Sequence, residues 1–180
     1  MDAMELRTLT ELLDLNGFEV VHAASDRSTK VRRLTVTPTT AGAALCPHCG
    51  MATVERHACH DRDAVDLPLG GWKTELVVHS FQFRCSSCDK FFTPWHPALA
   101  EGTHATERFL ERLAEWATHG DVSTAARYLG VAEKTAEGWY YDYLQRRTKE
   151  LPMVPARLPI RCLGLDELSL KKDTGNSAAC

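Results

Sequence analysis

Two short cysteine motifs decide the fold: residues 46–50 read CPHCG and residues 85–90 read CSSCDK. In each motif two cysteines flank a two-residue gap, so one tight turn can present both thiolates to the same ion. Zinc prefers four such soft ligands in a tetrahedron. The sequence therefore predicts one closed structural zinc site, and its four ligands are Cys46, Cys49, Cys85 and Cys88.

The first motif alone also fits a redox-active cysteine pair at the start of a helix. That arrangement requires a strand before the motif and an amphipathic helix after it. Residues 50–54 (GMATV) have no helical pattern, and a redox pair leaves the second motif without a role. We therefore favour the zinc site.

The segment between the motifs has the pattern of a zinc ribbon. A turn signal at residues 66–71 (DLPLGG) is followed by a partly alternating strand pattern at residues 72–84, which leads into the second motif. His57, Cys59 and His60 are further potential ligands. Because four cysteines already complete a tetrahedral site, we expect these three residues to be polar residues on a strand face.

Upstream of the ribbon, the sequence predicts a helix followed by a hairpin. Apolar residues recur at helical spacing over residues 4–15, and Asn16-Gly17 is a typical helix stop. Residues 18–22 and 31–36 have strand patterns, and the residues around 26–28 form a polar turn between them.

Downstream of the ribbon, the pattern predicts three helices. Thr106 can cap the first, which ends at Gly120; the second spans residues 123–129 and the third spans about 133–147. Small and apolar residues are spaced as in a helix-turn-helix, the motif that places its second helix in the DNA major groove. These are Ala126, Gly130, Val131, Ala136 and Trp139. An ordinary three-helix bundle without a ligand has the same spacing.

The third predicted helix carries the candidate DNA-binding residues. Lys134, Thr135 and Tyr141 would face the bases, and Arg146 and Arg147 suit backbone phosphates. The two arginines equally fit a solvated helix end that the helix dipole favours.

Features of the same region weaken this interpretation. Glu133 and Glu137 would repel phosphate, and Ala132 stands where a capping Ser or Asn is usual. Residues 121–150 contain five basic and five acidic side chains.

Length and composition limit the classes of protein to which the chain can belong. The chain has 180 residues, a net charge of −3 and seven cysteines, four of which have metal-binding spacing. A reducing, cytoplasmic location without a membrane span follows more naturally than a disulfide framework. Any DNA contact must come from local basic patches, because the overall charge does not attract nucleic acid.

Near the C-terminus, residues 158–172 read LPIRCLGLDELSLKK, a mostly apolar strand pattern that leads into Asp166 and Glu167. Folds for metal-dependent nucleotidyl transfer present their first carboxylate at the end of such a strand. A strand that ends in an exposed acidic turn would have the same pattern.

Together these features resemble the insertion-sequence L-three (ISL-three) family of bacterial transposases. The matching residues are 46–50, 66–71, 83–85 with Cys88, and 163–172, and the similarity reaches from the N-terminal helix to about Lys172. By this resemblance, the ribbon and the helix-turn-helix would bind the terminal inverted repeats of the element. The partners would be DNA and also a second copy of the chain or an intact transposase.

The resemblance also implies a catalytic role for Asp166, as the first acid of an Asp-Asp-Glu triad in a ribonuclease-H-like domain. Such a triad holds two Mg²⁺ ions that activate water or a DNA 3′-hydroxyl. This chain ends at Cys180 with only the first acid, so we expect a truncated transposase with an incomplete site and no strand-transfer activity. Mg²⁺ is expected only in a full-length relative.

The expected fold class is α+β: a small β-rich zinc ribbon, a helical helix-turn-helix bundle and one orphan strand of a ribonuclease-H-like domain. The expected function is recognition of insertion-sequence ends for DNA transposition. A module for protein contacts or transcriptional regulation without transposition is the alternative. The expected domains are an N-terminal helix and β-hairpin (1–40), the four-cysteine zinc ribbon (41–97), the helix-turn-helix (104–150), the start of the truncated catalytic domain (158–172) and a disordered tail (173–180).

Overall fold

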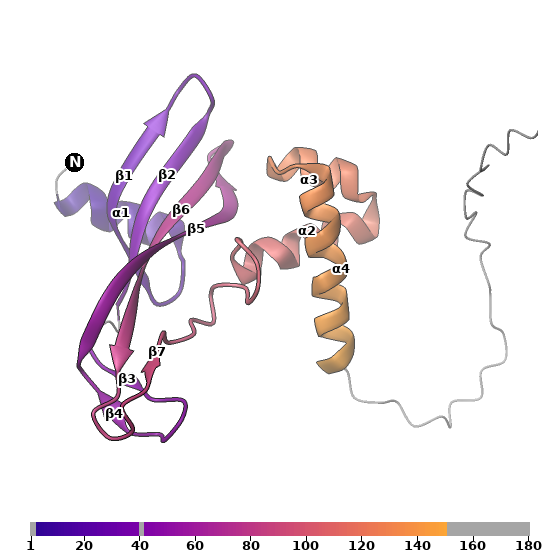
Figure 1. The fold of residues 1–180 in the computed structure, drawn as a ribbon. Coiled ribbons are helices and arrows are strands. Elements are labelled where there is room, and N and C mark those ends of the chain that lie inside the picture. The colour runs from indigo at the N-terminus through magenta and orange to yellow at the C-terminus, as the bar shows by residue number, and fades with distance from the viewer. Residues whose placement is uncertain (1–2, 40–41, 151–180) are drawn as a thin grey trace, which may run out of the picture. The chain divides into compact units, whose positions relative to one another are not determined.

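The chain forms four helices and seven strands over residues 3–39 and 42–150, which are the residues that the computed structural model describes (Figure 1). In chain order these elements are α1 (Ala3–Leu13), β1 (Phe18–Asp26), β2 (Val31–Pro38), β3 (Ala44–Leu45), β4 (Ala52–Thr53), β5 (Arg56–Leu69), β6 (Trp72–Arg84), β7 (Phe91–Phe92), α2 (Glu107–His119), α3 (Val122–Leu129) and α4 (Glu133–Glu150). The expected mixture of helices and strands is confirmed.

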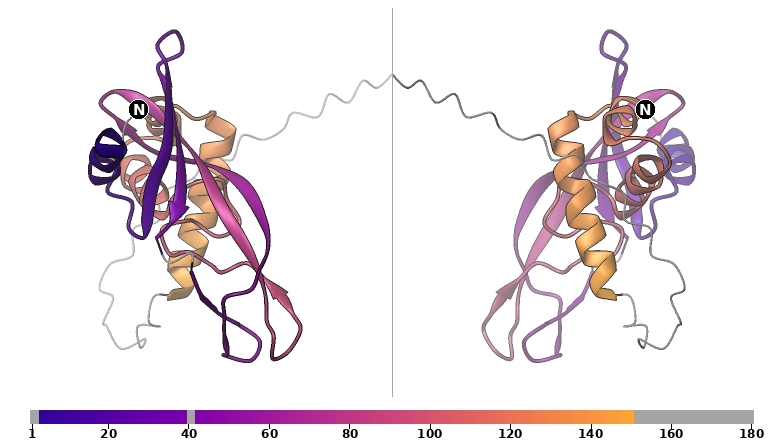
Figure 2. Two further views of the ribbon diagram at one scale, coloured as in Figure 1. Left: turned by 90° about the vertical axis from the view of Figure 1, so that its left-hand side faces the viewer. Right: turned by 90° about the vertical axis from the view of Figure 1, so that its right-hand side faces the viewer.

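β6 is the strand that organises the sheet. It pairs antiparallel with β5, parallel with β2 and, at its end, antiparallel with β7, while β1 lies on the outer side of β2. The long β5–β6 hairpin is visible in both views of Figure 2. β3 and β4 form a separate two-stranded ladder.

The parallel pairing of β2 with β6 differs from the expected domain division. The sequence predicts a boundary at residues 40–41, between the first hairpin and the ribbon, but residues 31–36 pair with residues 73–78 across that boundary. Pairing satisfies the backbone groups of two strands that would otherwise be exposed edges. The two hairpins therefore share one sheet.

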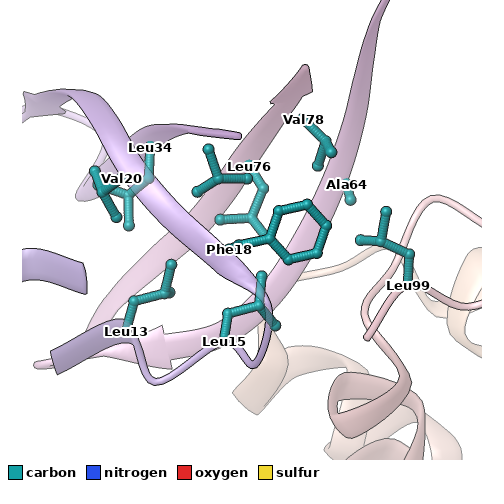
Figure 3. Packing of buried hydrophobic residues seen from close by; sticks show 10 residues of the cluster. Leu13, Leu15, Phe18, Val20, Leu34, Ala64, Leu76, Val78 and Leu99 are labelled. Atoms are coloured by element: carbon teal, nitrogen blue, oxygen red, sulfur yellow. The ribbon is translucent and has the colours of Figure 1, made fainter. Parts of the chain in front are cut away.

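Alternating burial along the strands produces the core beneath α1. β6 buries Thr74, Leu76 and Val78 at every second position, as expected for a strand with one face on a core. The core lies between the sheet, the end of α1 and the segment that follows β7 (Figure 3). Its buried members are Leu13, Leu15, Phe18, Val20, Leu34, Val36, Ala64, Leu76, Val78 and Leu99.

The three C-terminal helices have a core of their own, and their ends match the sequence prediction closely. The Thr106 hydroxyl accepts the Phe109 N–H at 3.3 Å, and the Asp121 carboxylate accepts the Thr124 N–H at 2.7 Å, so both residues are N-caps. Gly120 follows the last residue of α2, as predicted.

A buried carboxylate connects the helices to the sheet. Asp66 of β5 is fully buried; it accepts a hydrogen bond from the Thr106 hydroxyl at 2.6 Å and one from Arg108 Nε at 2.9 Å. The same guanidinium donates to the carbonyl oxygens of Leu13 and Asp14, each at 2.7 Å. Arg108 of α2 therefore contacts β5 and the end of α1 at once.

Asp166, the expected strand at 158–172 and the tail at 173–180 lie outside the described residues, so these expectations stay predictions. Within residues 3–39 and 42–150, no helix has both the length and the apolar character required to cross a membrane.

Candidate metal centre and nucleic-acid interface

Each of the two cysteine motifs folds into its own turn, and the two turns have the same hydrogen bonds. The Gly50 N–H donates to the Cys46 carbonyl, and the Asp89 N–H donates to the Cys85 carbonyl, each at 2.8 Å. The first cysteine of each motif also donates its N–H to a carbonyl beyond the turn, at 2.9 Å in both cases. Gly50 and Asp89 have positive φ angles of 74° and 56°, which close the two turns in the same way.

Short strand pairs hold the two turns beside each other. β3 and β4 flank the first turn, and the end of β6 and β7 flank the second. The buried Thr53 hydroxyl donates to the Arg84 carbonyl at 2.8 Å, and the Arg84 N–H donates to the Glu55 carbonyl at 3.0 Å. These bonds fasten the first turn to the strand that carries the second.

The four predicted cysteine ligands come together. The Sγ atoms of Cys46 and Cys88 are 3.6 Å apart, those of Cys49 and Cys85 are 3.5 Å apart, and all four lie within 4.8 Å of one another. Four sulfurs bound tetrahedrally at about 2.3 Å would be separated by about 3.8 Å. The geometry therefore fits a metal ion, and the ligand set is consistent with structural zinc.

The surroundings of the cluster are partly apolar. Cys46 and Cys85 are buried with Phe83 and Phe92, whose rings stack at 6.0 Å, while Cys49 is exposed. Two aromatic rings thus cover one side of the cluster and keep two of its sulfurs away from water.

The thiols of this cluster differ in acidity. The Cys88 N–H, aided by the Ser87 N–H, lowers the pKa of Cys85 to about 7 against the opposing effect of burial. The Met51 N–H favours the thiolate of Cys49, but the hydrogen bonds that Cys49 shares with the other cysteine sulfurs, above all with Cys85, raise the pKa of Cys49 to about 12. A bound ion would displace the remaining thiol protons, so metal binding releases protons.

α3 and α4 are joined by the tight turn that the spacing predicts. Gly130 has a φ of 72°, and the Val131 N–H returns to the Ala126 carbonyl at 3.0 Å, which is the hydrogen bond of a Schellman-type helix end. Ala126 and Ala136 are both buried in the core of the bundle, where their small side chains let the two helices approach. This leaves the first turn of α4 on the surface.

The five predicted DNA-binding residues do not form one group. Lys134 and Thr135 are exposed on the first turn of α4, and Tyr141 is 60% exposed further along. Arg146 lies about 18 Å from Lys134 along the helix axis at 1.5 Å per residue.

The two arginines are engaged within the protein. Arg146 Nη1 donates to the Glu107 carboxylate at 2.9 Å and connects α4 to α2, and Arg147 pairs with Glu150 at 3.2 Å. Arg146 is therefore less available to a phosphate than the sequence suggests, while Arg147, in an exposed pair, stays accessible. Of the five candidates, Lys134 and Thr135 are placed together at the exposed start of α4.

The sequence interpretation missed basic residues that come from the sheet. Lys73, at the start of β6, packs against the α3–α4 turn: its Cγ lies 3.6 Å from where a β-carbon on Gly130 would be. On the neighbouring strand, Arg32 pairs with Thr74 and its guanidinium lies 5.6 Å from the centre of the Trp72 ring, so it lies on the opposite face of the sheet from Lys73. Nothing in the local sequence of Lys73 indicates this neighbour, because the contact spans 57 residues of chain.

One carboxylate of α4 also has a structural partner. Glu133 accepts a hydrogen bond from the Ser123 hydroxyl at 3.0 Å and so helps to hold α4 against α3. Glu133 would therefore repel a nearby phosphate, but it also stabilises the packing of α4 against α3.

No protein-family model matches the chain, and comparisons with curated proteins and with solved structures also give no match. The transposase assignment stays a prediction from the sequence motifs.

Proposed function

We propose that the protein binds double-stranded DNA through α3 and α4, as the end-recognition part of an insertion-sequence transposase of the ISL-three type. The observation that carries the proposal is the α3–turn–α4 geometry. Gly130, Ala126 and Ala136 fix the turn, and the first turn of α4 projects from the bundle with Lys134 and Thr135 exposed. A helix presented in this way fits the major groove, where its N-terminal residues meet base edges.

Basic residues beside the turn support the proposal. Lys73 contacts Gly130 while its ammonium pairs with Glu75 at 3.0 Å, and the Lys73 N–H donates to the Lys30 carbonyl at 3.0 Å, which brings the backbone of Lys30 to the same end of β6. Cations that flank a recognition helix suit the backbone phosphates on either side of the groove.

We further propose that the metal held by the four cysteines is zinc and that its role is structural. Four thiolates leave no open position for water or substrate, and a closed site contributes folding energy. The metal would fix the paired turns at the end of β6.

The test measures binding of the purified full chain to duplex DNA from the ends of its own element. Fluorescence anisotropy monitors the binding at several salt concentrations. Lys134→Ala is expected to weaken binding about 5- to 100-fold, the range for one base or phosphate contact. Lys149→Ala, which removes an exposed lysine from the last turn of the same helix, is the matched control. Affinity for the element end should fall steeply with salt.

A wild-type affinity that Lys134→Ala leaves unchanged would contradict the role of α4. Failure of the wild-type chain to bind either the element end or unrelated duplex DNA would reject DNA binding altogether.

A role in protein contacts is the second candidate, and one observation favours it. Trp116 of α2 and Tyr128 of α3 are exposed and meet edge to face at 5.8 Å, which places two large aromatic rings together on the surface of the bundle. Aromatic residues are enriched at protein interfaces. Under this alternative, Trp116→Ala would abolish a partner contact and leave any DNA affinity unchanged.

A further inference from the structure

A second group of metal-ligating side chains lies on the β5–β6 hairpin, apart from the four cysteines. Cys59 and Asp61 are two residues apart on β5, so both point to the same face of the sheet. Asp61 pairs directly with His79 on β6, and Cys59 pairs with Phe81, the residue two positions beyond His79. The strand register therefore brings a thiol, a carboxylate and an imidazole to one place.

The three groups converge closely. One ligand atom from each of Cys59, Asp61 and His79 lies within 4.8 Å of the other two. The His79 Nδ1 and Asp61 Oδ1 atoms share a hydrogen bond of 2.5 Å, which an ion bound to both atoms would replace. Cys59 and Asp61 are exposed and His79 is half-buried, so an ion can reach all three from solvent.

We propose that Cys59, Asp61 and His79 form a second site, which binds a divalent metal ion such as Zn²⁺ through three protein ligands. One sulfur, one nitrogen and one oxygen donor suit a borderline ion of this kind. With three protein ligands, a tetrahedral ion keeps a fourth position for water. The site thus differs in kind from the closed four-cysteine cluster: it is open and its metal is exchangeable.

The charges around the group are of both signs, since the Arg56 guanidinium lies 4.4 Å from the centre of the Phe81 ring, opposite Cys59, while carboxylates lie on the Asp61 side. Asp63 lies two residues beyond Asp61, on the same face of β5, and adds a second carboxylate near the site. Arg62 points to the other face, where its guanidinium donates to the carbonyl oxygens of Ala100 and Thr103. The basic residue between the two aspartates therefore does not occupy the metal side.

Cobalt binding to the full chain tests the proposal. Cys162→Ser and Cys180→Ser form the background, because these two cysteines could otherwise contribute thiolates. Titration with Co²⁺ alone is expected to give one equivalent with the strong absorption of a four-thiolate ion and about one further equivalent with weaker, single-thiolate absorption. Azide should shift only the second spectrum, because only that ion has an open position.

Two variants and one control assign the second equivalent. Cys59→Ser and His79→Gln should each remove it and leave the four-thiolate spectrum intact, which also shows that the variant has folded. His60→Gln changes an exposed histidine next to Cys59 that is not part of the group, and it should retain both equivalents. The proposal is overturned if the Cys162→Ser/Cys180→Ser background protein binds only the four-thiolate equivalent, or if the second equivalent persists in either ligand variant.

Discussion

Gly50 and Asp89 occupy the same position in the two cysteine turns, and this position requires a positive φ angle that the two residues reach in different ways. Both residues have positive φ, which costs an ordinary side chain energy and glycine almost none. Asp89 is one of the residue types that tolerate this region, and its carboxylate also accepts a hydrogen bond from Arg84 Nε at 2.6 Å. Gly50 relies on the missing β-carbon alone.

Gly50→Ala should therefore weaken the metal centre. A β-carbon there would meet no atom within 4 Å, so the cost is backbone strain alone, roughly 1 kcal/mol. Gly70→Ala is a matched control, because Gly70 also has positive φ with open space around it but lies in the distant β5–β6 turn. Both variants should lose similar stability in urea, and only Gly50→Ala should raise the zinc dissociation constant in a chelator competition. Equal zinc affinities would show that the turn conformation does not limit binding.

His96 should make stability depend on pH. Its ring packs on Phe18 with centroids 4.0 Å apart; burial lowers the pKa of His96, and a hydrogen bond with the Gly17 backbone offsets only part of this. In the unfolded chain the pKa is about 6.5, so below that pH the unfolded state binds more protons than the native state. The stabilisation is complete above about pH 6.5 and is lost as the pH falls towards the lowered native pKa.

His96→Gln should consequently flatten the fall in unfolding free energy between about pH 7.5 and about pH 5.5. Acid release of a metal from the cysteines affects all variants alike, so the comparison is with His60→Gln, which alters an exposed histidine. A pH dependence that is the same in both variants would mean that His96 does not contribute to it.

At the scale of elements, α4 begins without the side-chain cap that α2 and α3 have. The Ala136 N–H donates to the Ala132 carbonyl at 2.9 Å, so Ala132 stands at the N-cap position and its methyl group cannot accept a hydrogen bond. Of these three helices, α4 is thus the one whose first turn lacks a side-chain cap, and it is the helix that we propose enters the DNA groove.

Ala132→Ser should stabilise the protein by about 1 kcal/mol, since a serine oxygen at this position can accept an N–H of the first turn. Ala132→Val provides the comparison, because valine cannot cap a helix. Thermal unfolding followed by circular dichroism measures both variants. A serine variant no more stable than the valine variant would show that the first turn of α4 is satisfied in another way.

Local elements were predictable from the sequence, because their causes are local. Thr106 as a cap, Gly120 and Gly130 as helix ends, and the two cysteine turns are each determined by a few neighbouring residues. The sequence also indicated that the four cysteines would meet, because metal spacing is itself a local pattern repeated twice.

Contacts between distant segments could not be predicted. The parallel pairing of β2 with β6 depends on which exposed edge finds a partner, and many registers satisfy the same alternation of side chains. The Cys59 group requires the β5–β6 register, and the contact of Lys73 with Gly130 requires the packing of the helices on the sheet. The parts of each candidate site that come from distant strands were missed for this reason.

At the scale of the whole molecule, stability should depend on the buried carboxylate that joins sheet and helices. Arg108→Met removes the charged partner of Asp66 and the two bonds to the end of α1, and we expect a loss of about 3–5 kcal/mol. Arg112→Met, on an exposed face of the same helix, removes only an ion pair with Glu115 and should cost little.

Urea unfolding measures both losses. Adding Asp66→Asn to Arg108→Met should restore part of the stability, because it removes the unpaired buried charge. A loss in Arg108→Met no larger than that in Arg112→Met would refute the central role of this pair.

The uninterrupted strand β6 sets a fixed distance between the α3–α4 turn and the paired cysteine turns. Its 13 residues span about 40 Å at about 3.3 Å per residue, with Lys73 against the α3–α4 turn near one end and Cys85 directly after the other. One turn of B-DNA is about 34 Å long. If α4 enters a major groove and the duplex runs along β6, the paired cysteine turns would meet the same side of that duplex roughly one helical turn away. Losing the metal would then shorten the stretch of DNA that is read, even where α4 itself stays folded.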